Sequence, residues 1–325
     1  MLLVVIYHCI LYWNGSWFVG EPVYSAPALG IISQWLNSFH IYAFALVSGY
    51  LFYYLKYEKG KYSAFIPFVK NKAKRLLVPY LFVSVVWVIP FAVAFFGYGP
   101  FEIFKRFALG TSPNQLWFLL MLFGVFVIFY PLSSFFAKHT FIGAALAIVL
   151  YGMGLIGPSI LPNVFQVFRA LQYIPLFWIG FKLRQYGSAK LRKIPTPVWI
   201  VADILVFVAG ELVSKFDGAI FSLLNLGVSF VLHIIGALMA FFVLQKIADK
   251  TKWAKSAVFA HLSKNSMPIY LFHQRFVYLS IYFLNGIINP YAHAVVNVAF
   301  AMSASLLLSF LLMKFRLTRS LIGEK

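Results

Sequence analysis

Residues 31–97, IISQWLNSFHIYAFALVSGYLFYYLKYEKGKYSAFIPFVKNKAKRLLVPYLFVSVVWVIPFAVAFFG, decide the fold class of this chain. Two apolar segments, 31–54 and 76–97, flank a connection that carries seven lysine and arginine residues. Each apolar segment has roughly the 20 residues that a helix needs to cross a bilayer. Lysine and arginine are retained in cytoplasmic loops, so the stretch predicts a pair of membrane-spanning helices with a cytoplasmic connection.

The same pattern continues along the whole chain. Apolar stretches cover 1–13, 31–54, 76–97, 114–134, 139–157, 167–184, 197–213, 219–245, 265–286 and 291–314. Of the 27 lysine and arginine residues, 22 lie in or beside every second gap or in the tail. This alternation follows the positive-inside rule. It predicts an all-α polytopic protein of the plasma membrane with about ten transmembrane helices and both termini in the cytoplasm.

The connections are too short to form a soluble domain, so residues 1–325 are expected to be one transmembrane domain. The second half of the basic segment 56–75 predicts an interfacial helix. Residues 14–30 predict an exported loop, and residues 99–113 predict a short surface helix on the outer side. The first stretch would rise only about 20 Å, short of a full span. It is therefore either a half-length helix or the end of a helix that begins upstream of Met1.

Charge and cysteine content restrict the functional classes. The formal charge is +19, yet basic residues at membrane edges need only anionic lipid as a partner, so nucleic acid is not expected. The single cysteine, Cys9, excludes an internal disulfide and a cysteine-based metal cluster. We expect no metal cofactor.

Ionisable side chains inside membrane spans are costly and are functional candidates by default. His8 is surrounded by apolar residues in MLLVVIYHCILYW, where a neutral imidazole would serve as a general base. A packing histidine is the equally weighted alternative. His273 and Arg275 lie in NSMPIYLFHQRF. Either the polar side chains of this helix face an interior cavity, or the arginine extends outward to the membrane surface. The lone carboxylate Asp203 is expected near the cytoplasmic interface.

Two further short segments carry possible chemistry. Ser48-Gly49-Tyr50 permits a close helix approach and offers two hydroxyl groups. In KNKAKRLLVP, Lys72 and Arg75 would be neighbours on one helical face, as a phosphate clamp requires. A plain positive-inside flank explains the same residues equally well.

Six motifs in order make the chain resemble the integral-membrane acyltransferase type 3 family, in particular its polysaccharide O-acetyltransferase branch. They are LLVVIYH ending at His8, FALVSGYLF at 44–52, KNKAKRLLVPY at 70–80, QLWFLLMLF at 115–123, FWIGFKLR at 177–184 and YLFH at 270–273. The resemblance extends from end to end. One feature differs, because relatives usually carry a basic residue about three turns before the first-helix histidine.

The resemblance implies acyl transfer, usually of acetyl from cytoplasmic acetyl-CoA to a sugar hydroxyl of a bacterial envelope or capsular glycan. It assigns catalysis to His8 and binding of the donor phosphates to Lys72 and Arg75, with Lys74 beside them. Ser48 and Tyr270 are then candidate donors to the oxyanion, and His273 is a candidate for orienting the base or the acceptor. The glycan or lipid-linked sugar, acyl-CoA and membrane lipids are the expected partners, and a homo-oligomer stays open. The alternative is a transporter that exports a lipid-linked sugar or polysaccharide.

Overall fold

The computed structural model describes residues 1–16 and 20–324, and within these residues all regular structure is helical. The helices are α1 Leu2–Ile10, α2 Pro27–Tyr53, α3 Phe65–Val83, α4 Ile89–Phe96, α5 Pro100–Ile103, α6 Trp117–Lys138, α7 Thr140–Ile156, α8 Val167–Tyr186, α9 Ala189–Arg192, α10 Thr196–Val213, α11 Ala219–Lys250, α12 Ala257–Lys264, α13 Ser266–Leu284, α14 Pro290–Met313 and α15 Arg316–Leu321. The all-α membrane architecture expected from the sequence is confirmed.

Eight helical segments of the described chain are long and apolar enough to cross a membrane. They are Pro27–Glu58, Phe65–Phe96, Asn114–Lys138, Thr140–Ser159, Val164–Tyr186, Thr196–Val213, Ala219–Lys250 and Pro290–Met313. The first and ninth expected spans are also helices. The first is the short apolar helix Leu2–Asn14. The ninth is α13, whose polar residues lower its hydropathy and whose middle is buried among its neighbours.

The basic segment before the third span is not a separate interfacial helix. Its second half forms the first turns of α3, and a turn of π-helix at Ser84–Val88 joins α3 to α4. The resulting 32-residue helix is about 48 Å long at the usual rise, which exceeds a bilayer core of about 30 Å. The basic turns therefore extend beyond the apolar layer. Residues 99–113 do form a short helix, α5, with a π-turn at Phe104–Ala108.

The helices α2 and α8 cross at two glycines. A Cβ atom on Gly49 would lie 1.8 Å from the carbonyl oxygen of Phe177, and one on Gly180 would lie 1.8 Å from that of Leu46. Neither position tolerates a side chain unless the backbones separate. The close helix approach expected at Ser48-Gly49-Tyr50 is therefore confirmed, and its partner is the glycine of FWIGFKLR.

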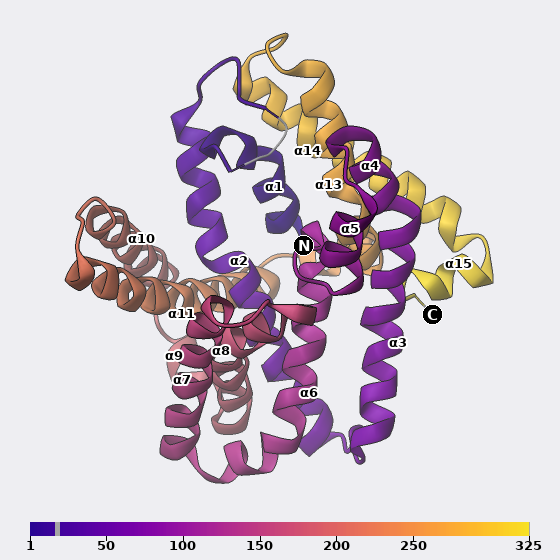
Figure 1. Ribbon diagram of the computed structural model, residues 1–325. Coiled ribbons are helices and arrows are strands. Elements are labelled where there is room, and N and C mark those ends of the chain that lie inside the picture. Colours follow the sequence, from indigo (N-terminus) through magenta and orange to yellow (C-terminus); the bar gives the residue numbers. More distant parts are fainter. Residues whose placement is uncertain (17–19, 325) are drawn as a thin grey trace.

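The short helix α1 packs against α2, α13 and α14, so the N-terminal segment lies beside the end of the chain (Figure 1). The α10–α11 hairpin projects to one side and reaches the bundle through α2 (Figure 1). Large apolar side chains cover the outer faces, including Phe141, which is 91% exposed, and Leu223 and Val295, which are each 69% exposed. A lipid environment stabilises such faces, whereas water does not. The packing of α1 against α13 brings His8 close to α13.

Candidate active site

A pair of histidines forms the centre of the site. The Nε2 atom of His273 lies 3.1 Å from the Nδ1 atom of His8, although the residues are 265 positions apart. His8 Nδ1 also lies 2.9 Å from the carbonyl oxygen of Val4. His273 Nδ1 faces the carbonyl oxygens of Ile269 at 2.9 Å and Tyr270 at 3.0 Å. Sequence analysis proposed both histidines but did not predict their contact.

These contacts determine which ring nitrogens carry protons. A carbonyl oxygen only accepts hydrogen bonds, so His273 Nδ1 must be the donor and its Nε2 carries the lone pair in the neutral ring. His8 Nδ1 then donates both to that lone pair and toward Val4. The lone pair of a neutral His8 is therefore on Nε2. A histidine held in one tautomer by a second ring is the arrangement that a general base requires.

Accessibility distinguishes the two rings. His273 is 0% exposed, whereas His8 is only half-buried. Tyr7 packs between His8 and His40, with ring centroids 4.9 Å and 4.6 Å away. His8 thus keeps a partly exposed surface, whereas His273 is enclosed. This favours His8 as the group that acts on substrate and His273 as the group that positions it.

A cavity of about 330 Å³, here called the Lys72 cavity, lies beside the pair. Its lining comes from α1, α2, α3, α6, α13 and the C-terminal segment, and it includes Val4, Ser48, Lys72, Arg75, Tyr270 and Glu324. Four of the seven residues proposed from sequence therefore share one cavity. His8 and His273 lie one helical turn or less beyond Val4 and Tyr270, which line it.

The basic residues of α3 divide into two faces. Lys72 points into the cavity, where its Nζ lies 3.8 Å from the ring centroid of Phe126. Arg75 also lines the cavity, together with Glu324. Burial raises the pKa of the Glu324 carboxyl, while the charges of Arg75 and Lys264 oppose that shift. Lys74 and Arg75 are both exposed, but Lys74 does not line the Lys72 cavity, which separates it from the other two.

The two proposed oxyanion donors differ in their hydrogen bonds. The Tyr270 hydroxyl donates to the carbonyl oxygen of Gln115, so its proton is directed away from the cavity. Ser48 also lines the cavity. Ser48 is thus the better placed of the two donors.

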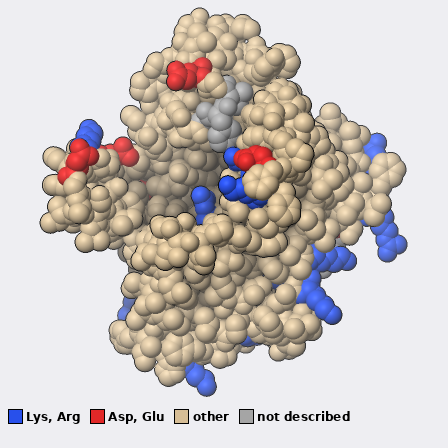
Figure 2. Space-filling model, viewed as in Figure 1, with Lys and Arg blue, Asp and Glu red and all other residues tan. Residues whose placement is uncertain are grey.

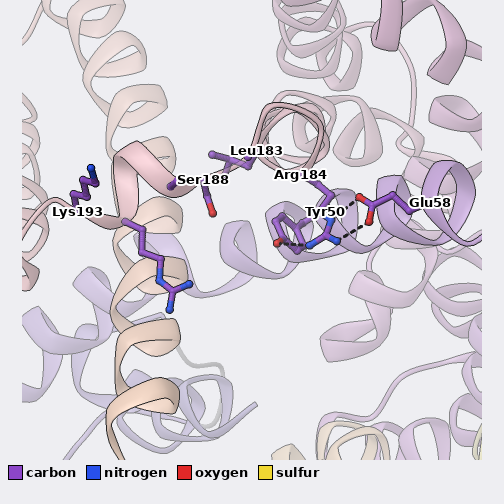
Figure 3. Close-up of a pocket in the computed structure, with 9 residues that line it drawn as sticks. Tyr50, Glu58, Leu183, Arg184, Ser188 and Lys193 are labelled. Carbon is purple, nitrogen blue, oxygen red and sulfur yellow. Dashed lines mark hydrogen bonds and ion pairs between the residues drawn. The ribbon is translucent and has the colours of Figure 1, made fainter.

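A second cationic pocket, of about 530 Å³, lies along the other face of α2. Figure 3 shows Arg184 between Tyr50 and Glu58, with Ser188 and Lys193 across the pocket. Arg184 holds both oxygens of Glu58, at 2.7 Å and 2.6 Å, and donates to the Tyr50 hydroxyl at 2.9 Å. Its guanidinium is therefore already engaged by a carboxylate, and this pocket is a weaker anion site than the Lys72 cavity.

Two further ionisable residues lie inside the bundle, and for Arg275 this is one of the two alternatives that the sequence left open. Asp203 is 0% exposed and accepts a 2.7 Å hydrogen bond from the Trp35 indole. Arg275 does not turn outward. It is also 0% exposed, with its guanidinium 5.0 Å from the Phe91 ring centroid. Local sequence could not reveal these partners, because both come from other helices.

A family model described as an acyltransferase domain matches residues 1–314, which include every helix from α1 to α14. No curated protein and no solved structure is significantly similar to the chain. The family match covers the histidine pair and the basic face of α3. The match does not specify the acyl donor or the acceptor.

Proposed function

Because this chain belongs to the acyltransferase type 3 family and is a membrane acyltransferase, we propose that it transfers acetyl from acetyl-CoA to a sugar hydroxyl of a cell-envelope polysaccharide. The observation that supports this most is the Lys72 cavity. It runs from two cations on α3 to the residues next to the His8–His273 pair. An elongated donor such as acetyl-CoA would place its charged end at the α3 cations and its reactive thioester near the histidine pair.

The donor would enter from the end of the bundle that carries the basic segment. Its phosphates are held by Lys72 and Arg75, since charge-assisted bonds to phosphate are among the strongest that side chains make. The thin pantetheine arm follows the apolar wall of the cavity past Ser48. The thioester then lies near Val4, one turn of α1 below His8.

The chemistry is a direct transfer. His8 Nε2 takes the proton of the sugar hydroxyl as the oxygen attacks the thioester carbonyl. The Ser48 hydroxyl donates to the oxyanion that develops. When the intermediate collapses, the C–S bond breaks and His8 returns the proton to the departing CoA thiolate. The products are the acetylated sugar and the free CoA thiol, and the proposed step uses no metal ion. His273 Nε2 accepts the hydrogen bond from His8 Nδ1 in both charge states, so the proton that His8 gains and returns is carried on Nε2.

The test is acetyl transfer by purified protein in vesicles, using radiolabelled acetyl-CoA and envelope glycan from the host. We expect alkali-labile radioactivity in the glycan, because an oxygen ester is cleaved by mild base. Movement of a lipid-linked sugar across the vesicle membrane without any ester formation would contradict the proposal and favour a transporter.

A further inference from the structure

A third cavity, of about 360 Å³, is here called the Arg169 cavity. It lies toward the ends of the helices that are opposite to the Lys72 cavity. It is formed by residues 34–42 of α2, the beginnings of α6 and α8, residues 225–233 of α11 and the end of α10. Figure 2 shows this face of the molecule hollowed beside the α10–α11 hairpin, with a basic surface visible inside. Of the six sequence motifs, only QLWFLLMLF contributes a residue to its lining, which is Trp117.

The lining of the Arg169 cavity is polar and aromatic. It includes Gln34, Asn37, Trp117, Arg169, Glu211 and Asn225. The Arg169 guanidinium lies 4.5 Å from the Trp117 ring centroid, which keeps both planar groups in place. Amides, a carboxylate and a guanidinium offer donors and acceptors for hydroxyl groups. Aromatic rings offer flat apolar surfaces that suit the C–H face of a sugar ring.

Three stacked rings form a rigid part of this lining. Tyr42 lies between His233 and Tyr173, at centroid distances of 3.7 Å and 4.7 Å and interplanar angles of 13° and 12°. His233 Nδ1 donates to the carbonyl oxygen of Ser38 at 2.8 Å. The neutral His233 therefore carries its lone pair on Nε2, where it can accept a hydrogen bond from a hydroxyl.

The Arg169 cavity approaches the histidine pair from the side opposite to the donor. Ile41 lines both this cavity and the Lys72 cavity, so one side chain forms part of both walls. Tyr7 packs on His8 and also on His40, the residue before Ile41, with ring centroids 4.9 Å and 4.6 Å away. A group held in the Arg169 cavity and a thioester in the Lys72 cavity would thus meet beside α1.

We infer that the Arg169 cavity binds the acceptor, as a polyhydroxylated sugar ring of the glycan. Trp117, Tyr42 and Tyr173 supply ring surfaces, and Arg169 and the amides bind hydroxyl groups. The volume is at the lower end of the range of about 300–1,000 Å³ for small-molecule sites, which suits one or two sugar rings. This inference rests on the proposed acetyl transfer.

The first experiment blocks the cavity chemically in a Cys9→Ser background. Ser229→Cys places a thiol in the cavity lining, and Ser222→Cys places one on the same helix away from it. A membrane-impermeant, positively charged methanethiosulfonate is added, and labelling is checked by mass spectrometry. We expect labelled Ser229→Cys protein to lose at least tenfold in glycan acetylation, with CoA still raising its melting temperature. Labelled Ser222→Cys protein should keep its rate. Labelling of Ser229→Cys that leaves acetylation unchanged would overturn the inference.

The second experiment separates acceptor from donor by kinetics. Arg169→Gln and Trp117→Leu should each raise the apparent KM for glycan about tenfold or more, because a bond from a charged donor or a ring surface is lost. The KM for acetyl-CoA should stay within twofold of the unsubstituted protein. A rise in the acetyl-CoA KM alone would assign the cavity to the donor and overturn the inference. If the unsubstituted protein transfers no acetyl at all, the proposed function itself fails.

Discussion

At the scale of single residues, the sequence indicated His8 and His273 separately, but not their contact. A histidine in an apolar span is recognisable from its neighbours in the chain. Its hydrogen-bond partner is 265 residues away, and its tautomer depends on backbone carbonyls of Val4, Ile269 and Tyr270. The contact between the two histidines depends on how α1 packs against α13, and no local sequence pattern encodes that packing.

The basic residues of α3 allow a matched comparison of two neighbouring charges. Arg75→Ala removes a cation that lines the Lys72 cavity, whereas Lys74→Ala removes one that is exposed elsewhere on the same helix. A charge-assisted bond to phosphate contributes about 1.5–3 kcal/mol, so Arg75→Ala should raise the acetyl-CoA KM roughly tenfold or more. Lys74→Ala should leave it nearly unchanged. Equal acetyl-CoA KM values in the two variants would mean that Arg75 does not bind the donor and that the basic segment serves only to orient the helix in the membrane.

At the scale of helices, glycine spacing proved more informative than charge. Ser48-Gly49-Tyr50 predicted a close crossing, and the crossing exists because Gly49 and Gly180 each face the backbone of the partner helix. The basic segment was harder to interpret. An amphipathic surface helix and the protruding start of a long span have the same composition, and only the continuous backbone from Phe65 to Phe96 distinguishes them.

The crossing gives a stability prediction with an internal control. Gly49→Ala inserts a methyl group where it would overlap a carbonyl oxygen, whereas Gly152→Ala adds one in α7 with no atom within 4 Å. Overpacking typically costs about 1–3 kcal/mol. Gly49→Ala should therefore lower the melting temperature and the yield of folded protein in detergent, and Gly152→Ala should not. Equal melting temperatures would mean that α2 and α8 are not as close as described.

At the scale of the whole molecule, the apolar stretches predicted the spans well, because a helix needs roughly 20 apolar residues to cross a bilayer. Eight expected spans satisfy both length and hydropathy, and α1 and α13 occupy the other two positions as helices. The two cavities were not predictable, since each collects side chains from several helices that are distant in sequence. The Arg169 cavity in particular takes only Trp117 from the motifs recognised in the sequence.

Sidedness follows from the same charge distribution and can be measured directly. In a Cys9→Ser background, Ser16→Cys and Ser188→Cys place single thiols in gaps of opposite charge character. An impermeant maleimide added to intact cells should label Ser16→Cys and should label Ser188→Cys only after the membrane is opened. Equal labelling of both thiols from outside would refute the proposed orientation, with both termini in the cytoplasm.

The central claim is that His8 acts as the base in acetyl transfer. The decisive measurement compares the transfer rates of His8→Ala, His273→Ala and His261→Ala, where His261 is an exposed histidine of α12. Loss of a general base typically costs about 10²–10⁴-fold, so His8→Ala should be nearly inactive while it still folds, inserts and binds CoA. His273→Ala should be less impaired, because it loses only the bond that positions His8, and His261→Ala should be unaffected. A folded His8→Ala protein that retains most of its transferase rate would contradict the account.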